Sequence, residues 1–268
     1  MVPKSISFKK VSDWIRLLNE PNGAFEKRIK QISGDSPEIV RAQKSWYHRI
    51  LSEFSRVYNA EADVIIARAP ARVNLVGMHI DHRGGSVNPI AAKEMIIVAQ
   101  ERDDDYILLH NIDSYRFQSR HFRICDELPG KPIKDWLQWT EEKSEEAKKN
   151  GTAGNWVNYV KAAACYLQEL HRNYKRLRGM NALVAGNIPI AAGLGSSSAL
   201  VVSSAEALLK INDIEIAPPK LAEVCGTAEW YVGTRGGCGD HSAIKLSKLG
   251  HISNISFFPL QIDFAPFQ

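Results

Sequence analysis

The sequence predicts an α+β fold in which a helical N-terminal extension precedes a sheet-containing domain. Before residue 60, apolar side chains recur at three- and four-residue spacing, which is the pattern of amphipathic helices. Short runs rich in β-branched and aromatic residues follow as far as residue 122. Helical patterns then alternate with apolar strands. We therefore expect one architectural boundary, near residue 60, with residues 1–60 as the extension and residues 61–268 as the main domain.

Two or three helices are predicted in the extension. One apolar stripe includes Trp14 and Leu18, and a later one includes Ile50 and Phe54. Residues 33–37, SGDSP, separate them, because glycine and proline end helices and serine or aspartate can cap the next one. Such an extension could cover the sheet, mediate assembly or do neither.

A mainly antiparallel sheet is predicted in the main domain. Its strands are expected at residues 64–69, 95–100, 106–111, 115–122, 180–185 and 250–258. Helices are expected at residues 134–149, 155–174, 196–209 and 219–231. This order places a strand shortly before the helix that begins at residue 196.

Composition and charge exclude several function classes. The 268 residues carry a net charge of +4, and no run of Lys and Arg is dense enough for a nucleic-acid or membrane-binding patch. No segment reaches the roughly 18 apolar residues of a membrane span, and no signal-peptide core follows the first residues. The four cysteines are scattered without metal-ligand spacing, as in reduced cytosolic proteins. We expect a cytoplasmic protein that binds neither nucleic acid nor membrane.

The most informative stretch is residues 187–200, NIPIAAGLGSSSAL, in which a strand end leads through small residues into a helix. Glycines let the backbone approach a ligand, and the first amides of a helix are unsatisfied donors that favour a phosphate. Serine hydroxyls can add contacts to phosphate oxygens or to Mg²⁺. Taken alone, the loop is equally compatible with a serine-rich helix cap after a tight turn. It matches neither the Walker pattern nor the dinucleotide fingerprint.

Three other segments accompany the loop: residues 68–85, RAPARVNLVGMHIDHRGG, residues 155–161, NWVNYVK, and residues 226–241, which end in GTRGGCGDH. The first resembles the galactokinase signature of the GHMP kinase superfamily, P-G-R-V-N-L-I-G-E-H-x-D-Y. The loop resembles the second motif of that family, and the other two segments resemble its W-x-x-Y-V-K helix and the region of its catalytic aspartate. Four matches in the same order, between about residues 63 and 258, argue against a chance resemblance.

The resemblance implies a ribosomal protein S5 domain 2-like GHMP kinase N-terminal domain with a helical extension. The family's third motif, a glycine-rich loop in its second domain, has no counterpart after Phe258. We therefore expect a fragment or truncated product whose C-terminal GHMP domain is largely missing. The missing half is an expected partner, and it would cover an apolar face of this chain.

By resemblance, the chain is an ATP-dependent kinase that transfers the γ-phosphate to a monosaccharide hydroxyl, the anomeric one. Asp240 would be the catalytic carboxylate that faces this hydroxyl, and Arg72 the cation that keeps it ionised and stabilises developing charge. Whether Asp240 takes the proton or only orients the hydroxyl is left open, because a loose transition state asks little of a base. A turn aspartate after glycines is the alternative interpretation of Asp240.

Residues for ATP and Mg²⁺ follow from the same resemblance. The nucleotide would be bound by Pro189, Gly193, Leu194, Gly195, Ser196, Ser197, Ser198 and Ala199. Magnesium would be held by Ser197 and Glu229, with Ser196 or Ser198 as alternative serine ligands. A surface glutamate on an amphipathic helix is the competing interpretation of Glu229.

The sugar-reading loop is only partly retained. His79 and Asp81 match the H-x-D triplet that would bind sugar hydroxyls, and Gly237 would approach the sugar with its backbone; a capped loop exposing a polar pair is the alternative for the triplet. Met78 replaces the family's glutamate and His82 its tyrosine. A hydroxyl buried against a thioether would lack a partner, at a cost of about 1–3 kcal/mol. The hypothesis follows that the sugar is not galactose.

Two other functions stay open at this point. Another GHMP activity, such as a mevalonate or homoserine kinase, fits the chain less well, because Trp156, Tyr159 and the triplet at residues 79–81 resemble the sugar-kinase branch. A catalytically inactive sugar or ATP sensor is the alternative from a different class. Retention of both Arg72 and Asp240 argues against it, while the absent third motif favours it.

Overall fold

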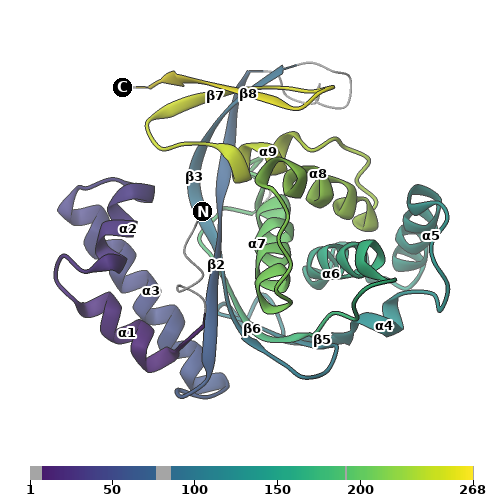
Figure 1. Cartoon of the computed structure of the whole chain (residues 1–268), viewed down its shortest axis with the longest axis horizontal. Coiled ribbons are helices and arrows are strands. Elements are labelled where there is room, and N and C mark those ends of the chain that lie inside the picture. Colours follow the sequence, from purple (N-terminus) through teal and green to yellow (C-terminus); the bar gives the residue numbers. More distant parts are fainter. Residues whose placement is uncertain (1–7, 77–85, 191, 268) are drawn as a thin grey trace.

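The computed structural model describes residues 8–76, 86–190 and 192–267, and it places helices on both faces of a mixed sheet (Figure 1). The strands are β1 (Lys9–Lys10), β2 (Asp63–Val76), β3 (Ser86–Glu101), β4 (Tyr106–Asn111), β5 (Arg120–Arg123), β6 (Met180–Gly186), β7 (His251–Ser256) and β8 (Gln261–Pro266). The helices are α1 (Val11–Asn19), α2 (Ala24–Ser33), α3 (Pro37–Val57), α4 (Ile124–Glu127), α5 (Trp136–Lys149), α6 (Val157–His171), α7 (Ser196–Ile211), α8 (Pro218–Ala228) and α9 (Gly239–Leu246). A 3₁₀ helix, η2 (Glu229–Val232), follows α8 directly.

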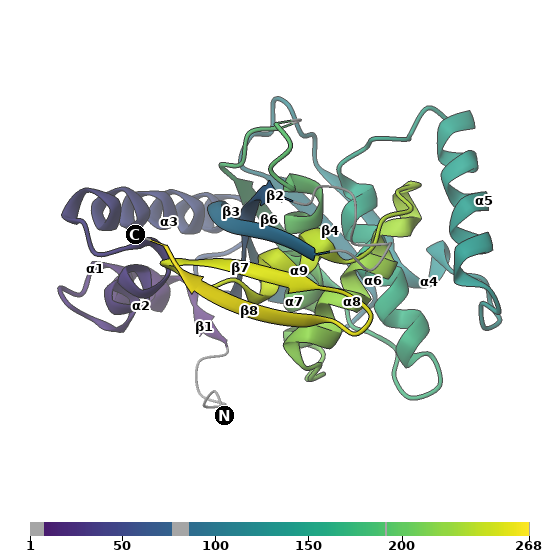
Figure 2. The same cartoon turned by 90° about the horizontal axis from the view of Figure 1, so that it is seen from above.

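The sheet has the order β1-β2-β3-β6-β4-β5, and the hairpin β7–β8 joins it through β3. Every described pair is antiparallel except β4 with β6, so the predicted mainly antiparallel sheet is confirmed. Strands β2 and β3 are the longest and form the spine of the molecule. The pairing of β2 with β3 ends beside the β7–β8 hairpin, which lies across one end of the sheet (Figure 2).

Alternating side chains of the two long strands divide the core in two. Val64 and Ile96 belong to one apolar cluster and pack with Phe54 and other residues of α1–α3. Ile65 and Ile97 belong to the other cluster, which includes residues of α6, α7 and α8. This is the alternation expected of strands buried on both faces. The extension therefore covers the sheet, which was one of the open alternatives, while residue 60 as a domain boundary stays a prediction.

The predicted elements are largely present, and the differences have local causes. The strand expected at residues 115–122 is reduced to β5, because the amides of Arg116 and Phe117 bond to the carbonyl of Asp113 in a turn. The helix expected to reach residue 231 becomes a 3₁₀ helix from Glu229. Helices α4 and α9 and strand β8 were not predicted, since each is short or lies next to turn-forming residues.

Two further expectations concern the whole chain. No disulfide joins Cys125, Cys165, Cys225 or Cys238. Among the described residues, no helix has both the length and the apolar character needed to cross a bilayer.

Candidate functional site

The predicted phosphate loop forms a compact turn at the N-terminus of α7. Gly193 and Gly195 have φ angles of 68° and 71°, a left-handed conformation that glycine adopts without steric cost. The first bond of the helix runs from the amide of Ala199 to the carbonyl of Gly195. The amides of Ser196, Ser197 and Ser198 therefore precede the helical ladder, and the positive end of the helix dipole lies with them. Such a terminus is suited to an anion.

Arg72 joins this loop to Asp240. Its Nε donates to Asp240 Oδ1 at 2.7 Å, and its Nη2 donates to Oδ2, so the guanidinium grips the carboxylate with two parallel bonds. Its Nη1 donates to the carbonyl of Gly193, and its backbone amide donates to the carbonyl of Leu194 at 3.1 Å. The side chain of Arg72 is 11% exposed and that of Asp240 is 32% exposed. The carboxylate thus keeps a face that a second molecule can reach.

Helix α9 places Asp240 in its first turn, where a carboxylate is favoured by the helix dipole. The segment before α9 is held close to α8 by a glycine. A Cβ added at Gly226 would lie 2.8 Å from Cys238 Cβ, closer than real Cβ contacts. Only glycine therefore lets α8 approach the segment that carries Asp240. Asp240 is the second residue of α9 and pairs with a buried arginine, so it does not lie in a turn; its catalytic role stays a prediction.

Glu229 lies beneath the N-terminus of α7 and is 6% exposed, so the interpretation as a surface glutamate is wrong. Ser198 Oγ donates to Glu229 Oε2 at 2.7 Å, and the nearby Ser197 hydroxyl also lowers the pKa of this carboxyl. His241 Nε2 lies 2.7 Å from the same Oε2. Burial raises the pKa of Glu229, but the His241 contact and the serine hydroxyls outweigh it, so the pKa lies below its usual value. Glu229 is therefore held as a carboxylate.

The oxygen atoms of Glu229 and of the neighbouring serine hydroxyls are of the type that binds a magnesium ion. Mg²⁺ prefers oxygen ligands and is held in kinases by one or two carboxylates together with substrate phosphates and water. Glu229 and Ser197 supply a carboxylate and a hydroxyl at the phosphate loop. No group of three or more His, Cys, Asp or Glu suited to a metal occurs in the part of the chain that the structure describes, so the protein alone offers no complete cage there.

The other predicted site residues are distributed unevenly. Leu194 and Ala199 lie within the loop and the first turn of α7, while Pro189 is exposed at its upstream end. Gly237 lies three residues before Asp240, and its role toward a sugar stays a prediction. Met78, His79, Asp81 and His82 lie outside the described residues.

Three features of the site were not predicted. His241 contacts Glu229, Gly226 admits the segment before α9, and the buried Ser198 hydroxyl donates to Glu229. No local sequence pattern predicts the contact between Ser198 and Glu229, because 31 residues separate them. The occurrence of a histidine directly after Asp240 was the one available signal.

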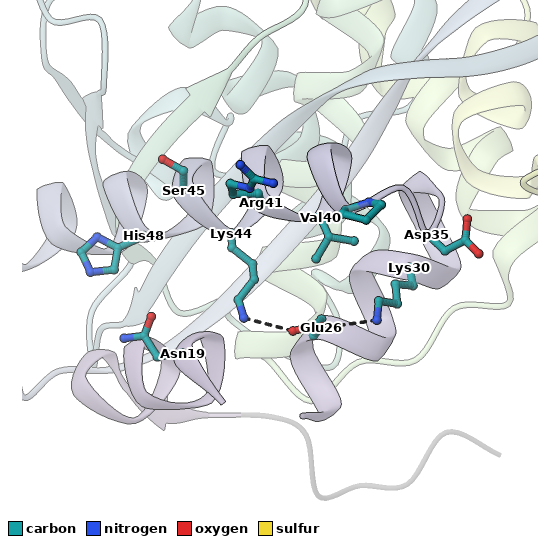
Figure 3. A pocket seen from close by; sticks show the side chains of 10 residues that line it. Asn19, Glu26, Lys30, Asp35, Val40, Arg41, Lys44, Ser45 and His48 are labelled. Atoms are coloured by element: carbon teal, nitrogen blue, oxygen red, sulfur yellow. Dashed lines mark hydrogen bonds and ion pairs between the residues drawn. The ribbon is translucent and has the colours of Figure 1, made fainter. Parts of the chain in front are cut away.

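A surface cavity of about 690 Å³ lies elsewhere, on the helical extension. Figure 3 shows Glu26 of α2 between Lys30 and Lys44, with Arg41 and His48 on α3. Both lysines are already paired with Glu26. No residue of the phosphate loop or of the Arg72–Asp240 pair lines this cavity.

Family models of known proteins match the two segments of the chain that carry the site residues. The family model described as "GHMP kinases N terminal domain" matches residues 158–248, and the model "Galactokinase galactose-binding signature" matches residues 52–102. The first range includes the phosphate loop, Glu229 and Asp240, and the second includes Arg72.

Curated relatives agree with these matches. Galactokinase of Dictyostelium discoideum is 31% identical over 81% of this chain, and galactokinase of Candida parapsilosis is 30% identical over 85%. The matches span 40% and 42% of those proteins, so the chain covers about two fifths of the length of these relatives.

Solved structures show the fold. Lactococcus lactis galactokinase in complex with galactose superposes with a TM-score of 0.64 at 23% identity, over 81% of this chain and 50% of that one. A mevalonate kinase superposes with a TM-score of 0.53 at 20% identity, over 76% of this chain and 56% of that one. The predicted fold class is confirmed.

Proposed function

Because the chain belongs to the GHMP kinases, we propose that it forms the nucleotide- and sugar-binding part of a sugar kinase of the galactokinase type. The observation that carries this proposal is the bidentate Arg72–Asp240 pair at the glycine and serine loop. Phosphoryl transfer requires a positioned hydroxyl and positive charge beside the transferred phosphate. Asp240, Arg72 and the amides at the start of α7 supply these parts within one small region.

In the proposed reaction, the oxygen of a sugar hydroxyl bonds to the γ-phosphorus of ATP while the bond from that phosphorus to the β–γ bridging oxygen breaks. ADP leaves with the electron pair of the broken bond, and the hydroxyl proton passes to Asp240. Each oxygen of Asp240 accepts one bond from Arg72 and keeps further lone-pair capacity for a hydroxyl. The partial exposure of the carboxylate leaves room for this contact.

Arg72 has two tasks in this proposal. It fixes the plane of the Asp240 carboxylate, and its bond to the carbonyl of Gly193 ties that plane to the phosphate loop. Substrate hydroxyl and nucleotide phosphate are thereby held relative to one another, which is the main requirement of phosphoryl transfer.

ATP is the proposed phosphate donor, bound with Mg²⁺. The loop amides at Ser196–Ser198 would contact phosphate oxygens, and Ser197 and Glu229 would hold the ion. When bound, magnesium neutralises charge on the phosphates.

The acceptor is proposed to be a monosaccharide, phosphorylated at the anomeric hydroxyl. The match to the galactose-binding signature and the names of the relatives support a sugar over mevalonate or homoserine. The retained Arg72–Asp240 pair supports catalysis over a role as an inactive sensor. That the sugar is not galactose is a separate hypothesis, which rests on Met78 in place of the family's glutamate. The C-terminal half present in the longer relatives is the proposed partner of this chain, and the cytoplasm its proposed location.

The test is sugar-dependent ADP release from the full-length protein over a panel of monosaccharides. Asp240→Asn keeps the size of the side chain and should lower turnover by about a hundred- to ten-thousandfold, because it removes the proton acceptor. Asp263→Asn, on β8, is a matched control that should leave turnover unchanged. Saturable sugar binding without ADP release in the unaltered protein would refute the kinase.

A further inference from the structure

A buried histidine that the proposed chemistry does not use follows Asp240 directly. His241 is 3% exposed, and its Nε2 lies 2.7 Å from Glu229 Oε2. Despite this short distance, neither ring nitrogen forms a well-aligned hydrogen bond within the described part of the chain. Glu229 is thus the polar group that the ring contacts.

Stability alone does not account for a histidine at this place. A buried polar group that lacks its hydrogen bonds costs free energy, and native proteins tolerate few of them. The neighbours of His241 within α9, Ser242 and Ala243, are small and fully buried. An apolar side chain would fill the space, but it would remove the Nε2 contact to the buried Glu229 carboxylate, so the imidazole has a reason to be there that packing does not supply.

The geometry around Glu229 suggests that reason. Successive residues of an α-helix point about 100° apart. Asp240 accordingly reaches Arg72 on β2, while His241 reaches Glu229 at the start of η2. One turn of α9 therefore contacts both acidic parts of the proposed site. Ser198 Oγ of α7 donates to Oε2, the same Glu229 oxygen that lies 2.7 Å from His241 Nε2, and the Ser197 hydroxyl lies near this carboxylate.

We propose that His241 is a positioning residue for Glu229, which it holds toward the serine hydroxyls of α7 so that a divalent cation bound with a nucleotide meets an oriented carboxylate. This inference rests on the proposed kinase function. His241 itself touches neither the sugar nor the phosphates. It acts through Glu229, as outer-shell partners act on the residues that hold a metal.

The test measures how Mg²⁺ strengthens the binding of ADP to the full-length protein, by calorimetric titration at a series of Mg²⁺ concentrations. His241→Leu removes the nitrogens at similar volume and should raise the half-saturating Mg²⁺ concentration about tenfold or more, as loss of an outer-shell partner does. His241→Gln retains a polar group that can reach Glu229 and should restore the value to within about threefold. His121→Leu, at an exposed position of β5, is the matched control and should match the unaltered protein.

A double-mutant cycle separates positioning from packing. If His241 acts through Glu229, His241→Leu should have no further effect on the Mg²⁺ dependence in a Glu229→Gln background. Additive effects of the two substitutions would overturn the inference. So would a His241→Leu protein whose Mg²⁺ dependence is unchanged.

A readout in the unaltered protein covers the case in which His241→Leu does not fold. The ring resonances of His241 are identified by their loss in His241→Gln. Adding Mg²⁺ with ADP should shift them, and unshifted resonances at saturation would overturn the inference. If the unaltered protein binds no ADP with Mg²⁺ at all, the proposed function fails and the inference with it. Binding that does not depend on His241 overturns the inference alone.

Discussion

The helical layer α1–α3 and the site at α7 and α9 use charged residues in opposite ways. In the helical layer, pairs such as Arg16–Asp13 and Arg56–Glu53 join an exposed arginine to a carboxylate three residues away. At the site, Arg72 and Asp240 are separated by 168 residues, and the arginine is buried. The first kind of pair is placed by helix geometry, whereas the second exists only because β2, α7 and α9 meet.

The two kinds of pair also differ in energy. Exposed pairs within one helix are worth about 0.3–0.5 kcal/mol and weaken with salt. A buried charge that loses its partner costs several times more, since water no longer solvates it. Stability in the helical layer should therefore come from its apolar face, and charge should matter chiefly at the site.

The largest effect on stability is expected from Phe54→Ala. Phe54 is fully buried between α3 and the sheet, and removing its ring should lower the free energy of unfolding by about 3–5 kcal/mol. Chemical denaturation measures this change. Because its cluster includes Val64 and Leu183 of the sheet, unfolding should remain a single transition. Two separate transitions would instead support a domain boundary near residue 60.

Arg72→Gln tests the long-range ion pair at the site. It leaves Asp240 without its cation and the carbonyl of Gly193 without its donor, and should lower the free energy of unfolding by about 2–3 kcal/mol, less than for a fully buried pair because Asp240 is partly exposed. Turnover should also fall, since the Asp240 carboxylate loses its orientation.

Arg56→Gln is the control in the helical layer. Its partner Glu53 lies three residues away, and the change in unfolding free energy should stay within about 0.5 kcal/mol. Equal losses for the two variants would contradict the contrast between the regions.

Gly226→Ala tests the close approach of α8 to the segment before Asp240. The added methyl would overlap Cys238 and should cost about 1–3 kcal/mol by overpacking, with a loss of turnover as Asp240 moves. Gly130→Ala, where no atom lies within 4 Å of the added carbon, should leave turnover unchanged. A Gly226→Ala enzyme with full turnover would show that this approach does not position Asp240.

The smallest effect is expected at Glu26. Lys30 and then Lys44 lower the pKa of this carboxyl from 4.5 to about 2. A lowered pKa contributes stability above pH 4.5, and the contribution is lost as the pH falls toward 2. A carboxyl NMR titration should give this low pKa, and Glu26→Gln should remove the corresponding part of the pH dependence. A Glu26 that titrates near 4.5 would contradict the pairing.

Local patterns in the sequence predicted most of the elements, for physical reasons visible in particular residues. Spacing of apolar residues placed α1–α3 and α6, because one face of each helix must be buried. Helix α9 was not predicted because its eight residues follow a glycine-rich run and its stability comes from packing on α8, α7 and β2. Strand β8 escaped because it pairs only with β7 among the described strands.

By itself, the sequence determined the kinds of residue at the site: a loop that must adopt left-handed angles, a helix start that favours an anion, and motifs in a family order. Those features depend on local backbone preferences, which neighbouring residues dictate. The resemblance already paired Arg72 with Asp240, but only the tertiary structure decided the two-bond geometry of that pair, the burial of Glu229 against Ser198, and the contact of His241 with Glu229. Such contacts join residues far apart in the chain, and the free energy of burying two apolar faces of one sheet is what brings them together.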